Sequence, residues 1–98
     1  MKAQEFEDRG LLAFLSGDYR QAIILFDRVT MAKADSAETW FYLGCSHAAI
    51  SLLQGKDGQQ SLQKAQQEFE QVRKLDPTFK TTPGLISPRI VELYRQAQ

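Results

Sequence analysis

The chain has 98 residues, of which 43% are hydrophobic, and its twelve basic and twelve acidic side chains cancel at neutral pH. This length fits one small domain over residues 1–98, and the apolar content is typical of a globular chain. Because the charges balance, we expect no nucleic-acid partner. No apolar run approaches the about 18 residues of a membrane span, so we expect no membrane insertion.

The sequence leaves the compartment of the protein open. Its single cysteine cannot form an intramolecular disulfide. The first seven residues are too acidic for a secretory signal. The default expectation is therefore the cytoplasm, or the bacterial periplasm if a signal was removed.

Apolar periodicity predicts two helices in the first third of the chain. One extends from about Lys2 to Leu15. The second begins after Asp18, a favourable N-cap, and fades around residues 32–34. Its apolar residues recur at helical spacing and indicate one buried stripe, formed by Tyr19, Ala22, Ile23, Phe26 and Val29.

Three more helices are expected in the rest of the chain. One is capped by Ser36 and runs to about Leu53, and it is apolar nearly all round. The next spans about residues 61–74 and ends before a proline. Between them, the glycine-containing polar stretch 54–60 is predicted as a loop. Residues 81–84 are expected to be irregular, and Ser87 then caps a last helix with proline in its first turn.

Several residue types recur along these predicted helices. An aromatic residue and a glycine reappear after 34 residues, and an alanine followed four residues later by phenylalanine also occurs twice. The recurring residues are Phe6 and Gly10, then Trp40 and Gly44, and the pairs Ala22/Phe26 and Ala65/Phe69.

The ordered set W-x2-L-G at residues 40–44, A-x3-F at 65–69 and proline at 77 resembles the tetratricopeptide repeat (TPR) family. The resemblance implies an all-α fold, a right-handed superhelix of antiparallel helix pairs with about five helices. Repeat one would span about residues 3–36, and repeat two about 37–77 with a loop insertion at 54–60. A tail with a capping helix would follow at 78–98.

The same resemblance implies a protein-binding scaffold rather than an enzyme, so we expect no catalytic residue, no cofactor and no metal site. The residues agree with this expectation. His47 stands at a position where the family motif carries a packed tyrosine. Cys45 lacks a partner that would activate it as a nucleophile, and a metal site would need more ligands than this chain brings together.

In the family, the first helix of each repeat lines a concave groove. A helical or extended apolar segment of a protein or peptide partner is therefore expected there. The positions that clamp a ligand carboxylate in some members hold Glu7, Leu11 and Tyr42 here, so that mode is absent. The candidate groove residues are Glu7, Leu11, Phe14, Glu38, Phe41, Cys45 and Ala48.

Other interpretations stay open. The chain's own tail could cover the groove and leave a structural or self-associating (homodimer) module, because arrays below three repeats need further stabilising contacts. The chain could also belong to a larger bacterial envelope-associated protein of this family. Finally, Ile24 and Met31 lie opposite the buried stripe of their helix and form a possible second contact surface.

Overall fold

The computed structural model describes residues 2–81 and 85–97, and every regular element among them is helical. In chain order the elements are α1 (Ala3–Leu15), α2 (Tyr19–Ala32), α3 (Ala37–Gln54), the short 3₁₀ helix η1 (Gly55–Gly58), α4 (Gln59–Leu75) and α5 (Pro88–Gln96). The expected all-α class is confirmed. Most of the stretch expected to be irregular, residues 82–84, lies outside the described residues.

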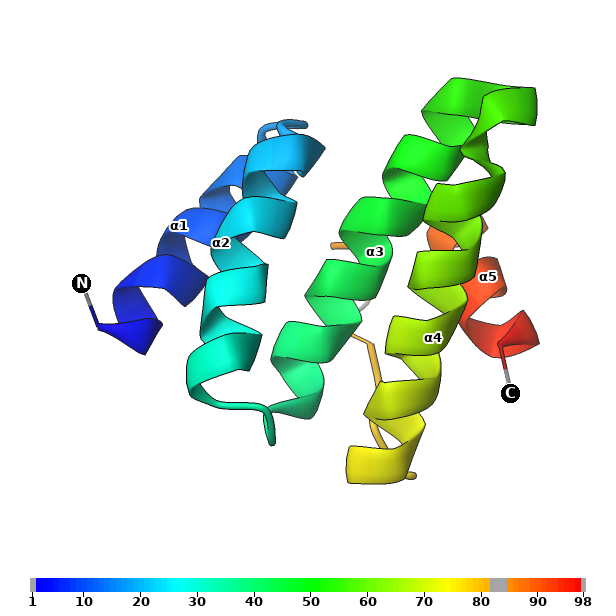
Figure 1. Cartoon of the computed structure of the whole chain (residues 1–98). Coiled ribbons are helices and arrows are strands. Elements are labelled where there is room, and N and C mark those ends of the chain that lie inside the picture. Colours follow the sequence, from blue (N-terminus) through cyan, green and yellow to red (C-terminus); the bar gives the residue numbers. More distant parts are fainter. Residues whose placement is uncertain (1, 82–84, 98) are drawn as a thin grey trace.

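Consecutive helices pack as antiparallel neighbours, α1 with α2, α2 with α3, and α3 with α4 (Figure 1). Helix α5 packs against both α3 and α4 and lies behind and to the right of α4 in this view. The described part of the connection from α4 to α5 passes behind α3 (Figure 1). The tail thus packs against the second helix pair.

Three predicted helix starts are confirmed by their capping hydrogen bonds. Asp18 Oδ1 accepts from the Gln21 amide at 3.3 Å, and Ser36 Oγ accepts from the Thr39 amide at 3.3 Å. Ser87 Oγ accepts from the amide of Ile90, three residues on, at 3.4 Å. These bonds satisfy backbone donors that have no partner within the helix.

The second helix pair is longer than the first, and the prediction of a loop at residues 54–60 is wrong. Helices α3 and α4 have 18 and 17 residues, against 13 and 14 in α1 and α2. Most of the insertion therefore extends the helices. Gly55 has a φ of 60°, and Gly58 lies so close to the Ser51 backbone that a Cβ would not fit. The two glycines make a tight helical turn possible.

An equivalent contact lies at the centre of each helix pair. A Cβ at Gly10 would lie 2.8 Å from Phe26 Cε1, and a Cβ at Gly44 would lie 2.5 Å from Phe69 Cε1. Phe26 and Phe69 are 0% and 1% exposed. In each pair, a glycine on the first helix therefore makes room for a buried phenylalanine ring of the second helix.

Candidate functional site

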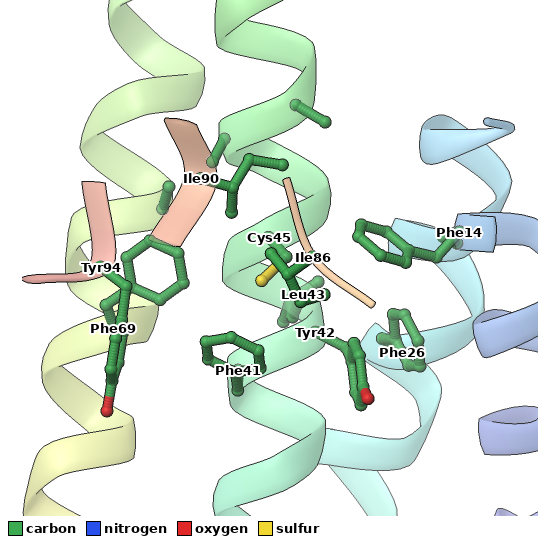
Figure 2. Packing of buried hydrophobic residues seen from close by; sticks show 14 of the residues in the cluster. Phe14, Phe26, Phe41, Tyr42, Leu43, Cys45, Phe69, Ile86, Ile90 and Tyr94 are labelled. Carbon is green, nitrogen blue, oxygen red and sulfur yellow. The ribbon is translucent and has the colours of Figure 1, made fainter. Parts of the chain in front are cut away.

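The surface of α3 that carries Phe41, Cys45 and Ala48, here called the inner face, is covered in the structure. These side chains are 1%, 0% and 0% exposed. They belong to one buried cluster with Ile86, Ile90 and Tyr94 of the tail, and Figure 2 shows Ile86 and Ile90 beside Cys45. The expectation of an open groove at these three positions is corrected, because the tail packs its own apolar side chains there.

Aromatic rings of the tail enclose Phe41. The ring centroid of Phe79 lies 5.2 Å from that of Phe41, and Tyr94 approaches Phe41 edge-on, also at 5.2 Å. Tyr94 makes a second edge contact with Phe69 at 5.2 Å. Edge-to-face pairs of this kind add stabilisation beyond the apolar area they bury. The tail is thus tied to both helices of the second pair.

Arg73 on α4 holds the end of α5 in two ways. Its Nη2 donates a hydrogen bond to the Tyr94 carbonyl oxygen at 2.9 Å, and its Cζ lies 4.3 Å from the centroid of the Tyr94 ring. A guanidinium over an aromatic face is a favourable cation–π contact. No local sequence pattern indicates the role of Arg73, because Tyr94 is 21 residues away and reaches Arg73 only when the tail folds back.

The candidates on α1 also have partners within the chain. Glu7 Oε1 accepts a hydrogen bond from Thr39 Oγ1 at 2.8 Å, and Thr39 is fully buried. Phe14 is buried between the rings of Tyr19 and Tyr42, with centroid distances of 5.6 and 5.9 Å. Glu7 and Phe14 therefore join α1 to its neighbours rather than face an open groove.

Neither Leu11 nor Glu38 is fully buried in the structure. Leu11 is half-buried against the core, and Glu38 is exposed. Glu38 borders a small depression of about 120 Å³ that Phe79, Lys80 and Thr81 of the tail also line. Among the described residues, Glu38 thus keeps an accessible position at this small depression beside the tail.

Two of the buried residues on α3, His47 and Cys45, carry groups that could take part in chemistry. His47 Nδ1 lies 2.6 Å from Glu68 Oε1 on α4, so the prediction of a packed histidine is confirmed. Burial raises the pKa of Glu68, and the hydrogen bond with His47 partly opposes this shift. Burial also raises the pKa of the Cys45 thiol well above its ordinary value, which keeps the thiol protonated and poorly nucleophilic at neutral pH.

The possible second surface, around Ile24 and Met31, is exposed. These side chains are 52% and 86% exposed. They border a shallow depression of about 670 Å³ whose other lining residues come from α1 and α2. The lining residues are Phe6, Ile24, Asp27, Arg28, Met31 and Ala32.

Within residues 2–81 and 85–97, no three His, Cys, Asp or Glu side chains are grouped so that they could hold a metal ion. None of the described helices is both long enough and apolar enough to span a membrane. In comparisons with known proteins, no family model, no curated protein and no solved structure matches this chain.

Proposed function

We propose that this chain is a non-catalytic protein-interaction module of the TPR type, whose inner face binds a helical or extended apolar segment. One observation carries the proposal. The inner face already holds a segment of this chemistry, the chain's own tail, with Tyr94 in edge contact with Phe41 and Phe69. A surface that binds such a segment in cis is suited to bind a similar one in trans.

The repeat architecture is supported by the equivalence of the two helix pairs. The glycine-to-phenylalanine contact occurs in both, and Ala22 and Ala65, four residues before each phenylalanine, are both 0% exposed. Helix α5 packs on the last pair as a capping helix would. A right-handed superhelix of two such pairs, the second with longer helices, is part of the proposal.

The chemistry of the tail indicates the chemistry of the partner. Ile90 and Tyr94, one turn apart on α5, are buried, whereas Arg89, Glu92 and Arg95 on the same helix are exposed. A partner segment would therefore be amphipathic, with an aliphatic and an aromatic residue at i and i+4. The tail must leave before a partner can bind, so only molecules with an open inner face are competent. The partner's apparent affinity is therefore its intrinsic affinity multiplied by the fraction of such molecules.

A peptide competition experiment tests this function. A fluorescent peptide of residues 85–97 would be titrated against the full chain and against its Tyr94→Ala variant, which loses both edge contacts of the tail. We expect the variant to bind the peptide about tenfold or more tightly than the wild type, because its inner face is open more often. The matched control is Tyr94→Phe, which keeps the ring and should bind like the wild type.

Equal binding by the wild type and a folded Tyr94→Ala variant would refute the proposal.

A Phe41→Glu variant would report on folding rather than on binding, although Phe41 is a candidate groove residue. Its side chain is 1% exposed, so a charge there would be buried without a partner and would destabilise the whole domain.

The second candidate function is a structural module in which the tail is a permanent part of the core. The continuity of the buried cluster from Phe14 through Phe41 to Tyr94 favours it. In that case Tyr94→Ala would unfold the entire chain in one transition and would not yield a folded, peptide-binding state. Circular dichroism of the variant at room temperature distinguishes the two functions.

A further inference from the structure

Among the residues that the structure describes, one side of α2 meets no other helix. In Figure 1, α1 lies behind α2 and α3 lies to its right, and the remaining side of α2 faces outward. Ile24 and Met31 lie on this side, opposite the buried Phe26. The corresponding positions of α4 carry the polar residues Gln67 and Lys74. The helix-pair architecture therefore does not require apolar residues at this surface.

The exposed residues follow the spacing of a helix-packing stripe. Ile24, Asp27, Arg28 and Met31 stand at i, i+3, i+4 and i+7, so they share one face of α2. The stripe borders the depression of about 670 Å³ that Phe6 of α1 also lines. Met31, at 86% exposure, projects beside this depression. One surface thus offers both a protruding apolar side chain and a hollow.

The stripe is complementary to itself under twofold symmetry. Within its own chain, the Arg28 guanidinium lies over the Phe6 ring at 5.8 Å, and Asp27 is partly buried on the side of His47 and Lys64. If two copies of α2 cross antiparallel about an axis between Asp27 and Arg28, each carboxylate approaches the guanidinium of the other copy. The same axis brings Ile24 of each copy to Met31 of the other. One isologous contact therefore matches a pair of opposite charges at its centre and an apolar pair on either side of it.

We propose that this chain forms a twofold-symmetric homodimer through the outer stripe of α2, with Ile24 against Met31 and Asp27 against Arg28 of the second copy. The proposal is independent of the inner face and of the tail. The pairing named here uses four residues of one helix on each copy, far fewer than the about 20–30 residues on each side of a standard interface. The dimer is therefore weak and its population depends on concentration.

Sedimentation equilibrium of the full chain over a wide concentration range tests the proposal. The average mass should rise toward twice the monomer mass for the wild type, and the doubly substituted chain Ile24→Gln/Met31→Gln should stay monomeric throughout. The matched control is Leu12→Gln/Leu53→Gln, which removes two exposed apolar side chains outside α2 that are 66% and 76% exposed. This control should associate like the wild type. A monomeric wild type, or a dimer that survives the α2 substitutions, would overturn the proposal.

A charge exchange tests the predicted pairing. Asp27→Arg and Arg28→Asp should each weaken association about tenfold or more, because each places like charges opposite one another. The double exchange should restore association, and a mixture of the two single variants should form a heterodimer. Failure of both restorations in variants with wild-type thermal transitions would rule out the twofold pairing. If a single variant does not fold, the result with Ile24 and Met31 decides the proposal.

Discussion

Gly44→Ala changes the contact on which the second helix pair depends. A Cβ at this position would lie 2.5 Å from Cε1 and 2.7 Å from Cδ1 of Phe69. Carbon atoms normally pack about 3.5–4.0 Å apart, so the ring or the helix must move by about 1 Å. The Phe69 ring has little room to move, because it touches the rings of Phe41 and Tyr94.

The net effect follows from two opposing contributions. Alanine favours an α-helix over glycine by about 1 kcal/mol. Overpacking a core costs about 1–3 kcal/mol, and more where neighbours cannot relax. Because the nearest atoms belong to an enclosed ring, we expect an overpacking cost at the upper end of this range, about 2–3 kcal/mol. Gly44→Ala should lower the free energy of unfolding by about 1–2 kcal/mol, equivalent to a fall in Tm of about 4–16 °C for a domain of this size.

Urea unfolding followed by circular dichroism measures this change. The alanine preference alone is obtained by comparing Gln67→Ala with Gln67→Gly, since Gln67 is exposed on α4. Gly10→Ala should cost less than Gly44→Ala, because its Cβ would stand 2.8 Å from Phe26 and the first pair carries no tail. A Gly44→Ala variant as stable as the wild type, or more stable, would refute the reasoning.

Two further predictions concern the tail and the α3–α4 contact. Ser87→Ala removes the side-chain acceptor of the Ile90 amide and leaves the Ser87 carbonyl oxygen, 3.1 Å away, as its acceptor. The loss of this cap should cost about 1 kcal/mol and speed hydrogen exchange in α5, and unchanged exchange would contradict the prediction. For Glu68, burial raises the pKa above its ordinary 4.5, so the folded state holds this proton more tightly than the unfolded chain. Its contribution to stability is therefore present below about pH 4.5 and is lost as the pH rises through the raised pKa. The stability of the wild type relative to Glu68→Gln should fall over that interval in pH-dependent urea titrations, and a rise would show that the bond with His47 outweighs burial.

Local signals made most of the helices predictable. Asp18, Ser36 and Ser87 each combine a capping side chain with an apolar pattern that follows it, and each caps a helix in the structure. The prediction of a loop at residues 54–60 is wrong because it relied on glycines in a polar stretch, which are typical of loops. The conformation of the turn at residues 55–58 depends on the positive φ of Gly55 and on the approach of Gly58 to Ser51, which only the antiparallel packing of α3 and α4 imposes.

The covering of the inner face was not predictable from local pattern. The apolar stripe of α5 indicates that Ile90 and Tyr94 are buried, but not which surface buries them. Glu7 is similar, since a carboxylate on a helix surface gives no sign of a hydrogen bond to Thr39, 32 residues away. Long-range packing decides both contacts, and the sequence could offer a tail-covered groove only as an alternative.

The central claim is that the tail closes the inner face and can leave it. The reactivity of Cys45 tests this claim most directly. Cys45 is the single cysteine of the chain and is 0% exposed. The rate at which a thiol reagent modifies it would be measured for the wild type and for Tyr94→Ala, together with global unfolding in urea. We expect the wild-type thiol to be strongly protected. In the variant, we expect Cys45 to be modified about tenfold or more faster than it would be if it reacted only in globally unfolded molecules. A wild-type thiol that reacts as fast as in the unfolded chain, or a variant whose rate follows global unfolding alone, would contradict the account.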